Sequence, residues 1–519
     1  MKEKLLGSTL IVGLMTSISR VLGFIRDQVI AIVFGANGNT DAFVVAQRIP
    51  NMLRRMVAEG AFSQAFVPVI AEYKNEHGEQ ATKKLVDHVA GTLLLWLLGI
   101  TVIGVLAAPL LILMVASGFS ANPEQADLAT LMLRITFPYI LFISLTALSA
   151  GILNSYGKFA LPAFTPVLLN VSIIACALLL APRLEQPIVA LAIGVLIAGV
   201  AQMLLQIPAL QKIGLLPKLR FKRGHPGVSK ILKLMLPALV GSSAAQINLL
   251  INTNLASFLI AGSVSWLYFS DRFVEFPLAI FGIAIATVML PKLSSETGQK
   301  QQFSETINWG LKLNLLVILP ATVGLIMLAQ PILATLLQYR AFTAFDTEMA
   351  SLSLATFALG LPAFAAIKVL APGFFSRQDT KTPMRFALYA IAFNIIFNLI
   401  VVVPWIWNKL PAGHAVLALA AALAAYVNAS LLYQRLRRDG AFSPGPEWHK
   451  FWKQIVPALL IMAMILFWLK PELVDWQDWS APARALRLLG LISAGAGAYL
   501  LTLLLTGARP GDFKNKVLP

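Results

Sequence analysis

The sequence predicts an all-α polytopic membrane protein with about 14 transmembrane helices, built as two pseudo-symmetric six-helix lobes plus two C-terminal helices. Of its 519 residues, 58% are hydrophobic and 13% are charged, whereas soluble domains average about 25% charged residues. Apolar segments long enough to cross a bilayer recur from one end of the chain to the other. Short sequence features also recur at one fixed spacing, which indicates an internal repeat.

Each predicted span provides roughly the 20 apolar residues that a bilayer requires. The spans cover residues 5–34, 41–71, 89–117, 128–153, 160–181, 187–210, 231–259, 264–290, 307–337, 347–375, 384–404, 412–434, 454–469 and 485–507. The first apolar stretch is longer than the core of a signal peptide and contains Arg20 and Arg26. We therefore interpret it as a retained span.

The charges of the connecting loops predict the orientation of the chain. With the N-terminus in the cytoplasm, the segments on the inner side hold 25 Lys and Arg residues, whereas the outer loops hold 4. Cytoplasmic loops of membrane proteins are enriched in these residues. The bias predicts an even number of spans with both termini in the cytoplasm. It also accounts for the net charge of +17 without nucleic acid as a partner.

Three matches at an offset of 222 residues indicate the repeat. They pair Gly60 with Gly282, Ala107-Ala-Pro109 with Ala329-Gln-Pro331, and Gly151 with Gly373. The alternative is chance recurrence of Gly and Pro. We predict an N-lobe at residues 1–220 (spans 1 to 6), a C-lobe at 221–440 (spans 7 to 12) and an added helix pair at 441–519. Two lobes with a substrate between them are a common plan among transporters.

The first two spans carry an unusual number of charges. They contain five arginines and three acidic residues: Arg20, Arg26, Arg48, Arg54, Arg55, Asp27, Asp41 and Glu59. Each arginine at bilayer depth costs about 2.5 to 3.5 kcal/mol on insertion scales. The surplus of positive charge predicts a wet cavity that binds an anion, and planar guanidinium groups suit phosphate. The alternative is internal neutralisation by the three carboxylates.

Helical geometry arranges these charges on the two spans. Arg20 and Arg26 lie about 120° apart on an ideal helix, and Gly23 between them is a candidate bend point. Arg48, Arg55 and Glu59 share one stripe, and Pro50 can kink their helix. In the eighth span we expect Asp271, Arg272 and Glu275 to gate the cavity or bind substrate. Three single charges, Arg134, Lys312 and Lys368, are interpreted as snorkelling or locally paired.

Other functions are weighed against this interpretation. A drug or cation antiporter would favour an acidic cavity. A membrane enzyme acting on polyprenyl phosphates would need acid pairs for Mg²⁺ or a positioned histidine, and the five histidines lie in loops or at span ends (His77, His88, His225, His414 and His449). The single cysteine, Cys176, excludes an internal disulfide, and no Cys/His metal spacing is present. A flippase for another lipid-linked saccharide remains open.

Several strings resemble one known family. They are SRVLGFIRD (19–27), TDAFVVAQRIPNMLRRMVAEGAFSQAFVPVIAEY (40–73), ITFPYILFISLTALSAGILNSYGKFALPAFTPVLLN (135–170), GSVSWLYFSDRFVEFPLAIFGIAIATVMLPKLS (262–294), KVLAPGFFSRQDTKTP (368–383) and NASLLYQRLRR (428–438). They resemble the MurJ (MviN) lipid II flippase family of the MOP exporter superfamily, and the resemblance covers nearly the whole chain.

The resemblance implies transport of lipid II (undecaprenyl-pyrophosphoryl-MurNAc-pentapeptide-GlcNAc) across the bacterial inner membrane for peptidoglycan synthesis. It implies a lipid-tail groove at the added helix pair. It transfers functional roles to Arg20, Arg26, Asp41, Arg54, Arg55, Glu59, Asp271 and Arg272. Asp27, Arg48 and Glu275 are secondary candidates that the charge pattern alone indicates. We expect a monomer that needs no cofactor, with cell-wall synthesis proteins as partners. Whether membrane potential, Na⁺ or H⁺ drives transport stays open.

Overall fold

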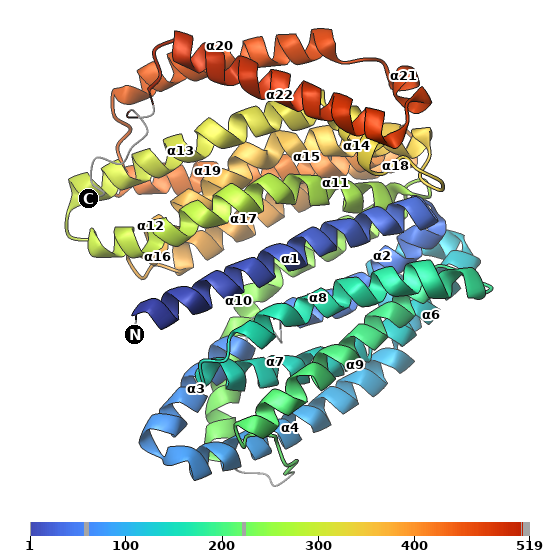
Figure 1. The fold of residues 1–519 in the computed structure, drawn as a ribbon, viewed down its shortest axis with the longest axis vertical. Helices are drawn as coiled ribbons and strands as arrows, with labels where there is room; N and C mark the ends of the chain where they lie inside the picture. Colours follow the sequence, from blue (N-terminus) through green and yellow to red (C-terminus); the bar gives the residue numbers. More distant parts are fainter. Residues whose placement is uncertain (1, 57–61, 221–224, 510, 512–519) are drawn as a thin grey trace. The chain divides into compact units, whose positions relative to one another are not determined.

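The computed structural model describes residues 2–56, 62–220, 225–509 and 511. Within these ranges the regular structure is entirely helical. The chain divides into two compact units, Met1–Ser265 (the first unit) and Trp266–Pro519 (the second unit), and each is described by itself. Figure 1 draws the first unit from blue to green and the second from yellow-green to red.

The first unit contains the longer helices of the N-terminal half. They are α1 (Lys2–Phe34), α2 (Gly38–Leu53), α3 (Ser63–Glu76), α4 (Gly78–Leu106), α5 (Ala108–Val115), α6 (Pro123–Thr136), α7 (Tyr139–Ser155), α8 (Ala160–Ala175), α9 (Val189–Lys212) and α10 (Pro226–Ser257). Short turns of other helix types, η2 (Ser117–Ala121), η3 (Cys176–Leu180) and η4 (Ala181–Arg183), lie between them.

Local sequence signals explain where helices of the first unit begin. The side chain of Asn37 accepts hydrogen bonds from the backbone N–H groups of Asn39 and Thr40, and so caps α2. Asn122 caps α6 in the same way, and Pro123 follows it as the first helical residue. α1 packs along α8, and α2 packs along α6. These two contacts position the charged faces of the first two predicted spans.

An apolar core joins one end of the first unit. Phe66 of α3, Leu85 of α4 and Ile152 of α7 are fully buried in it, with Leu210 of α9 and Ile231 of α10 packed beside them. Burying each of these side chains contributes roughly 1.5 to 3 kcal/mol. The core therefore fixes α3, α4, α7, α9 and α10 as one body.

The second unit contains the helices that follow α10 in the second repeat, together with the C-terminal helices. Its elements are α11 (Ser263–Pro277, which begins in the first unit), η5 (Leu278–Gly282), α12 (Ile283–Ser295), α13 (Lys300–Met327), α14 (Ala329–Leu336), α15 (Ala344–Leu370), α16 (Pro372–Phe375), α17 (Lys381–Phe397), η6 (Asn398–Val402), α18 (Val403–Trp407), α19 (Gly413–Arg438), α20 (Glu447–Leu469), α21 (Leu473–Asp478) and α22 (Ala481–Leu505).

The C-terminal helices α20 and α22 pack against each other, and α20 also packs against α13. Their shared core includes Ile455, Leu466, Leu491 and Trp476. Arg484 is buried and donates hydrogen bonds to four backbone carbonyls, which ties the start of α22 to neighbouring turns. The added pair is thus firmly attached to the second unit.

Ten helices in the described ranges are long and apolar enough to cross a membrane. They correspond to predicted spans 3 to 6 and 9 to 14. The other four predicted spans fall on α1, on α2 with α3, on α10, and on α11 with α12. These segments carry more charged or polar residues, and the second is interrupted by residues outside the described ranges. The predicted all-α polytopic fold is confirmed, and three of these four spans, all except the one on α10, carry the predicted site.

The two units repeat one interruption of a long helix. α4 ends at Leu106 and α5 follows it, while α13 ends at Met327 and α14 follows it. The first residues of α4 and α13, Gly78 and Lys300, are 222 positions apart. Helix positions thus agree with the sequence spacing. The lobe boundaries at residues 220 and 440 stay a prediction, because compactness places α10 with the first unit whereas the repeat places it with the second.

Candidate functional site

Arg26 of α1 is the best-anchored arginine of the predicted site. Its guanidinium group forms an ion pair with Asp27 at 2.6 Å and donates a hydrogen bond of 3.1 Å to the side-chain oxygen of Asn170 in α8. Asn170 in turn donates to the backbone carbonyl of Ser19. A Cβ atom at Gly23 would lie 3.7 Å from Asn170 Nδ2, which is an ordinary van der Waals contact. α1 passes through Gly23 as one continuous helix.

Arg20 lies on the same helix in a different environment. Its side chain is exposed, and it forms no hydrogen bond or ion pair with the described part of the chain. Arg26 therefore faces α8, whereas Arg20 is exposed, as their separation of about 120° around the helix predicts. A charge that stays exposed on a membrane helix can bind an anion without first breaking an internal pair.

Asp41 opens α2 and is completely enclosed, with 2% of its surface exposed. Its Oδ2 accepts a hydrogen bond of 2.7 Å from the backbone N–H of Gly262, and its Oδ1 accepts bonds from the N–H and hydroxyl of Ser265 at 2.8 and 2.6 Å. The carboxylate thus satisfies N–H groups at the start of α11, which a helix leaves without internal partners.

Arg48 projects from the middle of α2 toward α10. Its Nη1 donates a hydrogen bond of 2.6 Å to Thr253 Oγ1. The Thr253 hydroxyl itself donates to the carbonyl of Leu249, which fixes its orientation. Arg48 therefore links two helices of the first unit that are about 200 residues apart in sequence, besides any role in binding.

Arg54 and Arg55 lie where α2 changes into a wider π-helical turn, after Pro50. Arg54 donates from Nε to the side chain of Asn51 at 3.0 Å. The Arg55 side chain is exposed and has no hydrogen bond or ion pair with the described residues. Glu59, the expected partner of Arg55, lies outside the described residues, as does Gly60.

In the second unit, the predicted gating residues lie on α11. Arg272 forms an ion pair of 2.8 Å with Glu275, three residues further along the helix, and its guanidinium group lies 4.9 Å from the centre of the Tyr268 ring. Asp271 is exposed at the start of the same turn. The basic charge of Arg272 is therefore held locally by a carboxylate and an aromatic ring.

Two residues of this arrangement are absent from our sequence predictions. Asn170 holds Arg26, and Thr253 receives Arg48. Each is a neutral polar residue inside an apolar span, and this is the sequence feature that could have identified it as a site residue. Nothing in the linear sequence pairs either residue with its arginine, because the partners are 144 and 205 positions apart.

Taken together, the first unit carries arginines in three situations. Arg26 is paired with a carboxylate, Arg48 and Arg54 bond to neutral polar side chains, and Arg20 and Arg55 are exposed. Guanidinium groups bind phosphate oxygens through two parallel N–H bonds. Within the residues that the structure describes, no group of three or more His, Cys, Asp or Glu side chains could hold a metal ion. The chemistry available is anion binding.

Comparison with known proteins places the chain in a family. The profile described as "Lipid II flippase MurJ" matches residues 30–484. A probable lipid II flippase MurJ of Vibrio cholerae is 45% identical over 99% of this chain and 98% of its own length. The lipid II flippase MurJ of Burkholderia cenocepacia is 44% identical over 90% of each chain.

Solved structures agree with this result. A structure titled "Lipid II flippase MurJ, inward closed conformation" superimposes with a TM-score of 0.77 at 28% identity, covering 96% of this chain and 98% of that chain. An inward-facing MATE family multidrug transporter of the MOP superfamily has a TM-score of 0.67 at 15% identity, over 83% of this chain and 98% of that one, and so shares the fold. The chain therefore belongs to the MurJ lipid II flippase family of membrane transporters.

Proposed function

We propose that this protein moves lipid II from the cytoplasmic to the periplasmic leaflet of the bacterial inner membrane, for peptidoglycan synthesis. Membership of a flippase family over nearly the full length of the chain supports a transporter rather than an enzyme. The observation that carries the mechanism is the exposure of Arg20 and Arg55 on the first two helices, without an ion partner in the described structure.

The diphosphate of lipid II is the part that these arginines recognise. Moving a doubly charged headgroup through hydrocarbon is prohibitive, whereas the polyprenyl tail can stay in lipid along a groove at α20 and α22. A cationic central cavity compensates the diphosphate charge, and rocking of the lobes exposes it first to one side and then to the other. Arg26 and Arg54 add donors, and their neutral partners Asn170 and Asn51 orient them.

Asp41, Asp271 and Arg272 control access to the cavity in this proposal. Asp41 holds the start of α11 through its three hydrogen bonds. Arg272 can exchange its partner Glu275 for a group on another helix as the cavity opens or closes. Both termini lie in the cytoplasm, and the protein works as a monomer beside cell-wall synthesis proteins. Membrane potential contributes about 2.3 kcal/mol for each net charge moved through 100 mV, and Na⁺ or H⁺ coupling is the alternative source of energy.

The test replaces single basic residues in cells depleted of their own flippase. Arg20→Ala and Arg55→Ala each remove a charge-assisted contact worth about 1.5 to 3 kcal/mol, so we expect at least about tenfold less lipid II in the outer leaflet. Lys368→Ala is the matched control, because Lys368 also has an exposed side chain on a membrane helix and no ion partner among the described residues. It should leave transport unchanged.

The readout is the fraction of lipid II accessible from the periplasm, together with the chemical identity of the lipid. Full transport by both arginine variants would reject the diphosphate-binding role. A lipid that is chemically altered, rather than moved between leaflets, would reject the flippase function itself.

A further inference from the structure

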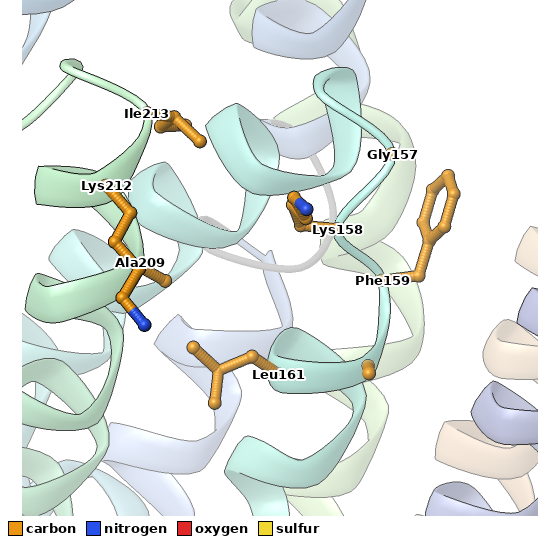
Figure 2. Close-up of a pocket in the computed structure, with 8 residues that line it drawn as sticks. Gly157, Lys158, Phe159, Leu161, Ala209, Lys212 and Ile213 are labelled. Carbon is orange, nitrogen blue, oxygen red and sulfur yellow. The ribbon is translucent and has the colours of Figure 1, made fainter.

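A cavity of about 470 Å³ opens at one end of the first unit. It is formed where α7 turns into α8 and where α9 ends, by the segment 157–161 on one side and by Ala209, Lys212 and Ile213 on the other. Figure 2 shows Lys158 and Lys212 bordering the same space from these two sides. The rest of the lining is apolar and consists of Phe159, Leu161 and Ile213 with the small residues Gly157, Ala160 and Ala209.

Among the described residues, no acidic group compensates the charge of this cavity. Lys158 and Lys212 are exposed and form no side-chain hydrogen bond or ion pair with the described part of the chain. The described residues that line the cavity include no carboxylate. Two ammonium groups above an apolar lining present a surface that fits an amphipathic anion.

A neighbouring cavity, of about 540 Å³, provides an internal contrast. It shares Ile213 with the first and also has basic residues in its lining, but Glu79 and Asp87 lie among them. Asp87 is 2% exposed and forms ion pairs with Lys83 at 3.3 Å and with Arg220 at 3.7 Å. The second cavity is therefore largely neutralised by the protein itself, and the first is left with its positive charge.

The cavity lies at the ends of two helices that are long and apolar enough to cross a membrane. Lys158 stands two residues before the first residue of the apolar helix Ala160–Arg183, and Lys212 is the last residue of the apolar helix Val189–Lys212. The loop charges predict that both residues face the cytoplasm, where the membrane surface is negative. Phe159 is 38% exposed at the same level, as expected of an aromatic ring at an interface. Basic pockets between membrane helices on this side bind phospholipid headgroups.

We infer that the cavity bounded by Lys158 and Lys212 binds the phosphate of an anionic phospholipid of the inner leaflet, with the acyl chains leaving along α8 and α9. This site is separate from the arginines of α1 and α2, and it goes beyond the transport of lipid II. Because its walls are the turn before α8, the start of α8 and the end of α9, a bound lipid bridges α8 and α9 of the first unit. Zwitterionic lipid lacks the net charge that the two lysines attract.

Native mass spectrometry of the purified full-length protein tests this site. Phosphatidylglycerol is titrated against the wild type and against Lys158→Ala/Lys212→Ala, with phosphatidylcholine as the uncharged comparison. We expect the double variant to lose about tenfold to thirtyfold in affinity for its most tightly bound phosphatidylglycerol. Lys158→Arg/Lys212→Arg keeps the charges and should retain binding. Lys300→Ala, which removes an exposed charge from the second unit, should have no effect.

Three outcomes would overturn the inference. Equal phosphatidylglycerol binding by wild type and double alanine variant would remove the site, provided that both proteins melt at the same temperature without added lipid. Equal binding of phosphatidylcholine would remove the role of charge. Displacement of the lipid by millimolar inorganic phosphate would assign the lysines to a small soluble anion instead.

Discussion

The first and second units interrupt a long helix at the same repeat position, but they differ in how the arginines of the predicted site are paired. α4 gives way to α5 around Ala107, and α13 gives way to α14 around Leu328. In both places the backbone N–H of the turn residue bonds to the carbonyl four residues earlier, in Ile103 and Gly324. The backbone plan is therefore the same in the two repeats.

The arginines of the predicted site are held differently in the two units. In the second unit, Arg272 pairs with Glu275 at 2.8 Å. In the first unit, Arg26 pairs with Asp27, whereas Arg20 and Arg55 are exposed and have no ion pair among the described residues. A repeat can thus keep its helices while one copy gains binding chemistry, because exposed charge changes little of the packing that holds the helices together.

Alanine substitutions of the glycines at repeat positions 151 and 373 should give the largest difference in stability between the two units. A Cβ atom at Gly151 would lie 2.9 Å from Phe66 Cδ1, whereas one at Gly373 would meet Ile307 and Leu436 at an ordinary 3.4 Å. Phe66 is fully buried and stacks on Phe62, so it cannot move away cheaply. Gly151→Ala should cost about 1 to 3 kcal/mol, and Gly373→Ala should be close to neutral.

Melting of the two purified variants beside the wild type measures this difference. A lower melting temperature for Gly151→Ala alone would support a tighter contact in the first unit. Equal melting of both variants would mean that the two repeats pack alike at this position.

Much of this architecture follows from the sequence because long apolar runs and repeat spacing are properties of the chain itself. The membrane helices were accessible in this way, whereas the breaks at Ala107 and Leu328 divide two spans that the sequence predicts as continuous. Arg20 and Arg26 were also accessible, since charge within an apolar run is conspicuous. The two compact units could not be derived, because the packing of α10 with the first unit depends on contacts such as that between Arg48 and Thr253.

The contacts of Asp41 illustrate why the rest of the site could not be derived. Its donors are backbone groups of Gly262 and Ser265 and one hydroxyl, more than 220 positions away. Every residue except proline has a backbone N–H group, so residue types do not show which of these groups bind Asp41. From the sequence alone, internal pairing of this carboxylate with an arginine was the alternative to consider. The cavity at Lys158 and Lys212 could not be predicted for a related reason. In the sequence each lysine is an ordinary loop charge, and only the packing of α8 against α9 brings the two together.

Carboxylates stabilise a helix start in each unit, but they act from different places in the chain. Asp346 caps α15 from within its own first turn, in a capping box with Thr343. Asp41 acts from a distant helix. Asp41→Asn keeps one oxygen for Ser265 but turns an amide N–H toward the N–H of Gly262. This change should cost about 1 to 3 kcal/mol, against about 1 kcal/mol for Thr343→Ala.

Hydrogen exchange of the amides of Gly262 and Ser265 distinguishes a local loss from a general one. Faster exchange at these amides in Asp41→Asn, with Thr343→Ala unchanged there, is the expected result. Unchanged exchange would mean that other groups hold this helix start.

The smallest expected effect comes from histidines at the loop end of the first unit. The Nδ1 atom of His225 accepts a hydrogen bond of 3.2 Å from the N–H of Gly227 and so caps α10, while the ring lies 4.9 Å from His88 and 5.9 Å from Tyr73. Burial lowers the pKa of His225, and the charge of His88 lowers it further. The capping bond also needs the neutral ring, because a protonated Nδ1 cannot accept.

The sign of the pH effect follows from this lowered pKa. The unfolded chain takes up a proton near pH 6.5, whereas folded His225 does so only at lower pH, so acidification favours unfolding. Stability should be constant above about pH 7 and fall by roughly 1 kcal/mol or less as the pH drops through 6. His225→Asn retains a capping side chain without the titrating ring, and it should flatten the melting temperature between pH 7.5 and 5.5. A variant that keeps the full pH dependence would assign it to His88, His77 or another group of this cluster.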